Sequence, residues 1–209
     1  MVRRTMTQDL SPSDLSPAAP RELLHLRDIA LRGYARADGL FDIEAHLTDT
    51  KTYGFPNEDR GGRIEAGEPL HEMRIRLTVD ADMMITACEA ATLHGPHTMC
   101  PNITPNFARL AGLRIGPGFI RAAKERVGGV QGCTHLVELL QPLGTVAFQT
   151  LYAVRVKRAK AAQGKGEARP PALLNTCHAY ATDSKVVARR WPQFYTGGAA
   201  PPAKDKPEA

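Results

Sequence analysis

Residues 40–52 alternate between apolar and polar side chains, and this period of two constrains the fold more than any other pattern in the chain. From 41 to 47 the odd positions are apolar, and from 42 to 50 the even positions are polar: Phe41, Ile43, Ala45 and Leu47 against Asp42, Glu44, His46, Thr48 and Thr50. Successive side chains of a β-strand point to opposite faces, so the segment is a strand with one buried face. The polar face either is exposed to solvent or lines a polar cavity, and Glu44 and His46 are its candidates for chemistry.

Three further strands accompany this one. Residues 22–36 precede it across Ala37-Asp38-Gly39, in which the Asp-Gly pair is typical of a hairpin turn. Residues 70–79 and 83–93 flank Asp80-Ala81-Asp82, and residues 57–62 connect the two hairpins as a loop. The first half of the chain therefore predicts four antiparallel strands.

From residue 105 the apolar pattern becomes helical. Residues 106–113 and 117–127 are expected to be short helices, the second with Pro117 in its first turn. A long helix is expected from Cys133 to about Arg158, interrupted near Pro142 and Gly144. The predicted fold class is α+β, a four-stranded antiparallel sheet of two hairpins packed against the long helix of the C-terminal half and the shorter helices.

The length of 209 residues suits one domain with a hydrophobic core, which we place at residues 21–196. Residues 1–20 and 197–209 have little apolar periodicity and are predicted to be disordered tails. The chain contains no apolar run long enough to cross a membrane, and no apolar signal segment follows Met1-Val2-Arg3-Arg4. These features predict a cytoplasmic protein that does not bind membranes.

Charge and cysteine spacing exclude further classes. The 27 Lys and Arg exceed the 22 Asp and Glu, but the one dense basic stretch, residues 155–160, is better explained as a solvated helix end than as a nucleic-acid patch. No nucleic-acid motif accompanies it, so we expect no nucleic-acid partner. The four cysteines, at positions 88, 100, 133 and 177, lack the paired spacing of a disulfide framework or a zinc site, and reduced thiols are expected.

A glycine-rich loop at residues 128–132 leads into Cys133, His135 and Glu138 at the start of the long helix. A thiol, an imidazole and a carboxylate within six residues can serve proton transfer, nucleophilic attack or metal binding. Along a continuous helix, a polar stripe within about 80° of arc would contain His135, Glu138, Pro142, Thr145 and Gln149. The stripe is either the solvent face of the helix or one wall of a pocket, whose other wall would carry Glu44, His46 and His71.

His71 interrupts an otherwise apolar set of odd positions in its strand, Met73, Ile75, Leu77 and Val79. It is therefore expected at the mouth of the core-facing side, either as a hydrogen-bonded core residue or as part of a site.

Several strings of the chain resemble those of a bacterial family known as domain of unknown function 2889. They are residues 32–34, 41–51, 67–71, 116–119, 132–140 and 176–180, and the likeness spans roughly residues 20–195. The resemblance implies no activity. The recurring polar residues of the family pattern fall on Glu44, His46, Asp49, Lys51, His71, Cys133, His135, Glu138 and His178. As a set they resemble a buried proton-transfer site.

A second similarity is to iron–sulfur scaffold proteins of the IscU type. It rests on the order of strands, Cys100, the Gly132-Cys133 helix start and the late Cys177-His178 pair. It implies a metal or cluster held by Cys100, Cys133, His135 and Cys177. Cys100 departs from that pattern because it precedes Pro101 instead of lying in a glycine-containing turn between strands.

Three functions follow as hypotheses. The first is a cofactor-free acid–base enzyme of lyase type, acting on a small aromatic or acyl molecule, as in aromatic catabolism. His135 or His46 is its general base, and Glu44 or Glu138 orients that base. Lys51 or backbone amides supply electrophilic support, and His71 completes the catalytic set. The substrate-binding residues are Tyr34, Arg32, Gln149 and Thr145. The second is the metal or cluster-binding module, and the third is a non-catalytic small-ligand-binding protein.

The motifs of dinucleotide-binding, P-loop, α/β-hydrolase and zincin enzymes are missing from the sequence. The partners that we expect are a small-molecule substrate and, as an open alternative, further copies of the chain.

Overall fold

The structure is a computed structural model that describes residues 16–162 and 170–198. Its contacts divide the chain into two compact units, Met1–Lys160 and Ala161–Ala209. Most of the two predicted tails, 1–20 and 197–209, lies outside the described residues.

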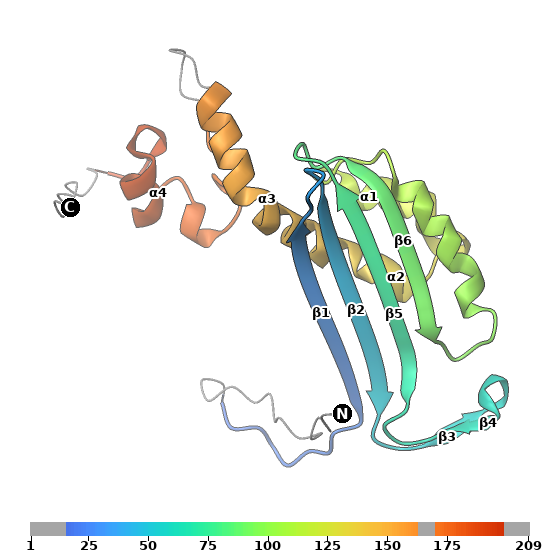
Figure 1. Ribbon diagram of the computed structural model, residues 1–209. Coiled ribbons are helices and arrows are strands. Elements are labelled where there is room, and N and C mark those ends of the chain that lie inside the picture. The colour runs from blue at the N-terminus through green and yellow to red at the C-terminus, as the bar shows by residue number, and fades with distance from the viewer. Residues whose placement is uncertain (1–15, 163–169, 199–209) are drawn as a thin grey trace. The chain divides into compact units, whose positions relative to one another are not determined.

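A four-stranded antiparallel sheet forms the body of the first unit (Figure 1). Its strands are β1 (His25–Ala35), β2 (Phe41–Lys51), β5 (Pro69–Val79) and β6 (Ile85–His94), in the spatial order β1-β2-β5-β6. The Ala37-Asp38-Gly39 turn joins β1 to β2, and Gly39 has the positive φ of 84° that such a turn requires. The predicted α+β class and the four antiparallel strands are confirmed.

The loop expected at residues 57–62 has structure of its own. β3 (Phe55–Asn57) and β4 (Gly62–Ile64) pair as a two-stranded sheet around a single 3₁₀ turn, η1 (Glu58–Arg60). Ile64 is buried, so this small hairpin is anchored by one apolar side chain.

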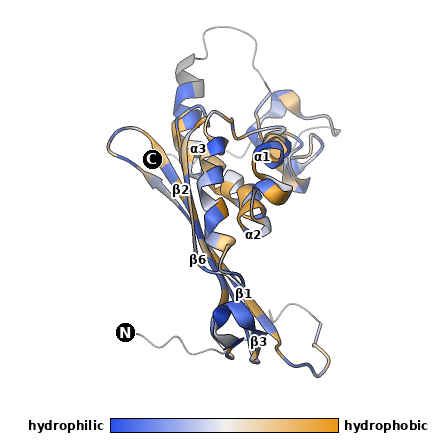
Figure 2. Ribbon diagram, turned by 90° about the vertical axis from the view of Figure 1, so that its right-hand side faces the viewer, coloured by the Kyte–Doolittle hydropathy of each residue, from blue (hydrophilic) through white to orange (hydrophobic). Residues whose placement is uncertain are grey.

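The helices of the first unit cover only one face of the large sheet, which Figure 2 shows edge-on. The core lies in this interface. On β2 the odd positions Phe41, Ile43, Ala45 and Leu47 are buried, as the alternation predicted, and so is Asp49. The even positions point to the face that these helices leave open.

Two predicted helices differ from the observed ones in their bounds. The first is the 3₁₀ helix η2 (Cys100–Leu110), which begins and ends earlier than residues 106–113. The second is α1 (Phe119–Val127), which begins after Gly118 with a φ of 83°. Pro117 therefore precedes the helix instead of occupying its first turn, because a residue with this left-handed backbone cannot be helical.

The long predicted helix is divided into α2 (Thr134–Glu138) and α3 (Leu140–Ala162), after the short turn η3 (Gly129–Gln131). The interruption lies at Leu139, a few residues before the expected Pro142 and Gly144. Pro142 is its physical cause: proline has no N–H to bond the carbonyl of Glu138, and its ring collides with that carbonyl in a regular helix.

The second unit contains η4 (His178–Tyr180), α4 (Lys185–Arg190) and η5 (Pro192–Phe194). Ser184 caps α4 by accepting a hydrogen bond from the backbone N–H of Val187. Trp191 lies against Tyr180 with ring centroids 5.5 Å apart. Within the described part of the chain, no helix combines the length and apolar character needed to cross a membrane.

Candidate functional site

A buried carboxylate defines the candidate site. Asp49 is 1% exposed and, with Thr78, is one of two buried polar side chains among the described residues. It lies near the end of β2, where it continues the core-facing set of odd positions beyond Leu47. An ionised carboxylate in such a place requires charged or hydrogen-bonding partners.

Arg27 supplies the first partner from β1, where it lies directly opposite Asp49 in the strand register. Its Nε and Nη2 each donate a hydrogen bond of 2.7 Å to a different carboxylate oxygen. Burial alone would raise the pKa of Asp49, but the hydrogen bonds and charge of Arg27 outweigh burial and lower it. The same pairing raises the pKa of Arg27. Both groups are therefore charged at neutral pH.

His71 faces Asp49 from the other side, on β5, and is its register partner there. Its Nδ1 lies 3.1 Å from Asp49 Oδ2. Burial lowers the pKa of His71, His135 lowers it further, and Asp49 offsets only part of this shift. A neutral His71 beside an ionised carboxylate carries its proton on Nδ1 and donates it to Asp49, which leaves Nε2 as an acceptor.

His135 reaches the same place from α2. Its ring lies over that of His71, with centroids 3.8 Å apart and ring planes inclined by 33°, and its Nε2 lies 3.9 Å from Asp49 Oδ2. Burial lowers the pKa of His135, and the nearby charge of Arg27 adds to this shift. Both stacked imidazoles are therefore neutral at pH 7.

Two more contacts connect α2 and β1 to the site. Glu138 accepts a hydrogen bond of 2.7 Å from Arg27 Nη1, so that one guanidinium joins the strand carboxylate to the helix carboxylate. His25 Nε2 lies 3.3 Å from Asp49 Oδ1. We call Arg27, Asp49, His71, His135 and Glu138 the Asp49 cluster.

A groove of about 580 Å³ runs beside the cluster. It is lined by Ile120, Lys124, Gly128, Gly129, Cys133, Thr134, Val137, Glu138 and Gln141. Glu138 belongs to both the groove and the cluster. Cys133 connects them as well, because its Sγ lies 3.9 Å from His135 Nδ1 and 3.7 Å from Met73 Sδ. A small molecule in this groove would reach the cluster from the side of Cys133 and Glu138.

The structure therefore brings His135, His71 and Glu138 together, but it separates Glu44 and His46 from them. These two lie on the opposite, open face of the sheet, because even and odd positions of β2 point to opposite faces. Glu44 accepts a hydrogen bond of 2.8 Å from Arg76, and His46 lies 3.0 Å from Glu72. The facing wall that we expected them to form is corrected to Arg27, Asp49 and His71.

The predicted substrate-binding residues also lie elsewhere. Arg32 and Tyr34 alternate with the core-facing positions of β1 and lie on the open face. Thr145 and Gln149 are exposed on α3, and the Thr145 hydroxyl donates to the backbone carbonyl of Gln141. The expected polar stripe assumed a continuous helix, and the break at Leu139 separates its two halves.

Lys51 ends β2, two residues after Asp49, and its Nζ lies over the ring of Tyr53, 5.2 Å from the centroid.

The residues of the cysteine-based metal hypothesis are divided between the two units. Cys100 opens η2 against Gly95, Cys133 contacts His135, and Cys177 and His178 are exposed in the second unit. Among the described residues, the group suited to a metal is Asp49, His71 and His135, whose ligand atoms all lie within 4.8 Å of one another. Only His135 is common to this group and the cysteine-based set.

Arg27 and His25 were not among the predicted site residues, and Asp49 was predicted only as one of the recurring polar residues of the family pattern. The signal for Asp49 was present, because a charged residue in register with Phe41 to Leu47 on the apolar face is exceptional. The signal for Arg27 was also present. A hairpin centred on Asp38 brings residue 27 opposite residue 49.

Comparison with known proteins identifies a family and no activity. No curated protein and no solved structure matches the chain. A family model described as protein of unknown function (DUF2889) matches residues 25–149, which include β1, the whole large sheet, α1, α2 and the complete Asp49 cluster. The chain belongs to this DUF2889 family.

Proposed function

We propose that this chain is a cofactor-free acid–base enzyme that cleaves a C–C or C–O bond of a small aromatic or acyl molecule. The observation that carries the proposal is the pair of stacked imidazoles, His71 and His135, beside the buried carboxylate of Asp49. A histidine with a lowered pKa is neutral at pH 7 and can accept a proton.

His135 is the better placed of the two to meet a substrate. Its Nδ1 is directed towards Cys133, which lines the groove, whereas the Nδ1 of His71 is engaged by Asp49. In the proposed step His135 removes a proton from the substrate, the electron pair that is released breaks the neighbouring bond, and the same proton passes to the leaving group. His71 positions His135 by stacking, and Asp49 fixes the tautomer of His71.

The groove supports a substrate with an apolar body and an anionic end. Ile120 and Val137 give it apolar walls, and Lys124 places a cation at its α1 side. Proton transfer by a positioned histidine contributes about 10²–10⁴-fold to a rate, which sets the loss expected when His135 is replaced.

The test compares metabolite extracts from the source cells after incubation with the wild-type protein and with His135→Gln. We expect at least one metabolite to be consumed by the wild type and to persist with His135→Gln, while Thr145→Ala, a replacement in the exposed half of the predicted stripe, acts like the wild type. Identical extracts with wild type and His135→Gln would overturn the proposal. Ligand retention without turnover would instead favour a binding protein.

Metal binding is the second candidate, because Asp49, His71 and His135 supply the two imidazoles and one carboxylate found in many metal sites. Against it, Arg27 occupies both oxygens of Asp49 and would repel a divalent cation. Metal analysis of the purified protein separates the two candidates. Stoichiometric zinc or iron that is lost in His71→Ala would favour this one, and turnover that survives dialysis against a chelator would favour the first.

A further inference from the structure

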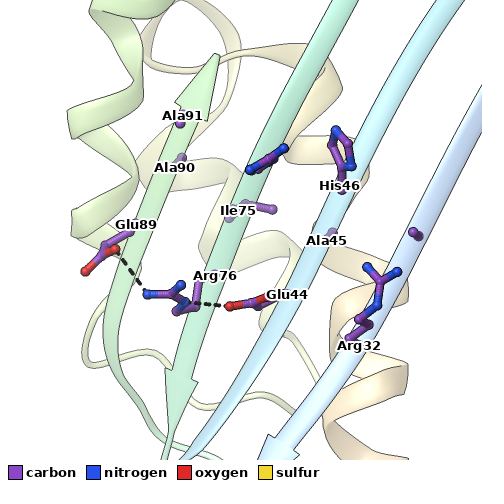
Figure 3. Close-up of a pocket in the computed structure, with 11 residues that line it drawn as sticks. Arg32, Glu44, Ala45, His46, Ile75, Arg76, Glu89, Ala90 and Ala91 are labelled. Atoms are coloured by element: carbon purple, nitrogen blue, oxygen red, sulfur yellow. Dashed lines mark hydrogen bonds and ion pairs between the residues drawn. The ribbon is translucent and has the colours of Figure 1, made fainter. Parts of the chain in front are cut away.

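The open face of the large sheet carries an ordered pattern of charge. Arg32, Glu44, Arg76 and Glu89 are register partners in succession, so they form one row across β1, β2, β5 and β6. Figure 3 shows this row, with Arg76 between the two glutamates. The charges alternate in sign from one edge of the sheet to the other.

Among the described residues, the charges in the middle of the row are closely paired and those at its ends are not. Arg76 Nε donates a hydrogen bond of 2.8 Å to Glu44, whereas its contact with Glu89 is 3.6 Å long. Glu89 is 77% exposed, and Arg32 has no carboxylate within ion-pair distance among the described residues. One unsatisfied cation therefore lies at the β1 edge and one weakly held anion at the β6 edge.

We infer that this face binds the same face of a second copy of the chain, across a two-fold axis that runs parallel to the strands. Such an axis keeps each row at its height and reverses the order of the strands. Arg32 of one copy then faces Glu89 of the other, and Glu44 faces Arg76. Facing sheets pack about 10 Å apart, a gap that arginine and glutamate side chains span together.

The edge positions of the neighbouring rows are complementary under the same axis. The next row is Ala30, His46, Arg74 and Ala91, so that the small side chains of its edges face each other. The row beyond it is Asp28, Thr48, Glu72 and His94, and here Asp28 faces His94 of the other copy. On the other side, Tyr34 faces the small Ala87.

The other two-fold arrangement, with the axis along a row, is unfavourable. It places each strand over its own copy, so Arg32 meets Arg32, or, when shifted by one row, Arg76 meets Arg74. Like charges held together across an interface oppose association. The charge pattern thus selects one relative orientation.

The area of the open face and the groove on it are consistent with an interface of moderate size. Four strands of ten or eleven residues present on the order of 600 Å² per copy, a little below the roughly 800 Å² of a standard interface. A groove of about 440 Å³, lined by Ala30, Arg32, His46 and Arg74 among others, leaves room for side chains of the second copy.

The test is sedimentation equilibrium of the full chain, from low micromolar to several hundred micromolar. We expect a monomer–dimer equilibrium that weakens with salt. Arg32→Glu alone and Glu89→Arg alone should each raise the dimer Kd about tenfold or more, since each creates two like-charge pairs across the axis. The double variant Arg32→Glu/Glu89→Arg exchanges the two charges and should restore the wild-type Kd.

Arg121→Glu is the matched control, because it makes the same charge change at an exposed position of α1. It should leave the Kd unchanged. A chain that stays monomeric at every concentration overturns the inference, and so does a dimer that tolerates both single variants or a double variant that is no better than either. None of these outcomes depends on the proposed acid–base activity.

Discussion

Arg27 and Asp49 face each other in the register of β1 and β2, and the guanidinium bonds both carboxylate oxygens at 2.7 Å. Asp49 is buried, whereas Arg27 is about 30% exposed. Breaking the pair would therefore destabilise the protein mainly by leaving the carboxylate buried without a charged partner. The pair therefore stabilises the sheet and also forms part of the candidate site.

Asp49→Asn keeps the shape of the side chain and removes its charge. We expect it to lower the free energy of unfolding by about 3 kcal/mol, since Arg27 loses a charged partner and one of the two acceptor oxygens becomes an NH2 group that meets the donors of Arg27 or His71. Urea unfolding monitored by circular dichroism measures this change. Asp82→Asn, in an exposed turn, is the control and should cost under about 0.5 kcal/mol. Equal effects of the two replacements would contradict the structural role of Asp49.

How far the sequence determines this site follows from strand geometry. Alternation and the hairpin turns were sufficient to predict the sheet, and the Ala37-Asp38-Gly39 turn also implies that Arg27 lies opposite Asp49, since register follows once the turn is known. The pairing of Asp49 with His71 does not follow in this way, because residues 52–68 separate β2 from β5. The sequence did not show that Glu44 and His46 lie on the opposite face of the sheet from the Asp49 cluster. Polar residues on the outer face of a strand look the same whether a second layer covers them or not.

The helical part was less predictable for a different reason. A stripe calculated at 100° per residue needs an unbroken helix, and the break at Leu139 lies between Glu138 and Thr145. Pro142 signals a break, but its position depends on packing, because Leu139 and Leu140 are both buried in the core.

The stability of the protein should fall on mild acidification. The pKa values of His71 and His135 are lowered in the folded state, so below about pH 6.5 the unfolded chain binds more protons than the folded one. The contribution of these two histidines to the free energy of unfolding is therefore complete above about pH 6.5, and it decreases as the pH falls towards their folded-state pKa values. Asp49, whose pKa is also lowered, adds a further loss below about pH 4.

Urea midpoints between pH 8 and pH 5 measure this dependence. His71→Gln removes one of the two titrating groups and should flatten the decline, although its stability at pH 8 is lower. His178→Gln, an exposed position in the second unit, should leave the slope unchanged. A wild-type midpoint that is constant over this range would show that the two histidines are not held neutral by the fold.

Glycine is required at position 132 because there is no room for a side chain, and not because of its backbone conformation. Its φ of −155° suits any residue, but an added Cβ would collide with the carbonyl oxygen of Val127 and lie 2.7 Å from the carbonyl carbon. Gly132→Ala should destabilise the protein by about 1–3 kcal/mol and displace the adjacent Cys133. Gly116→Ala, where an added Cβ meets no atom within 4 Å, should be close to neutral. Thermal unfolding of both variants tests this contrast.

Gly33 allows α3 to approach β1 closely. A Cβ at this position would overlap Thr150 Oγ1 and lie 2.9 Å from both Thr150 Cβ and Cγ2. We expect Gly33→Ala to lower stability by about 1–3 kcal/mol, because the helix or the threonine must move away from the strand.

A double-mutant cycle separates this contact from a general intolerance of alanine in β1. Thr150→Ala removes Oγ1 and Cγ2, so Gly33→Ala should cost less in that background, and the difference measured by urea unfolding is the coupling between the two positions. Thr150→Ala alone should have a small effect, since alanine favours helices and the lost hydroxyl only bonds the carbonyl of Val146. Additive effects would mean that α3 does not pack on β1 at Gly33.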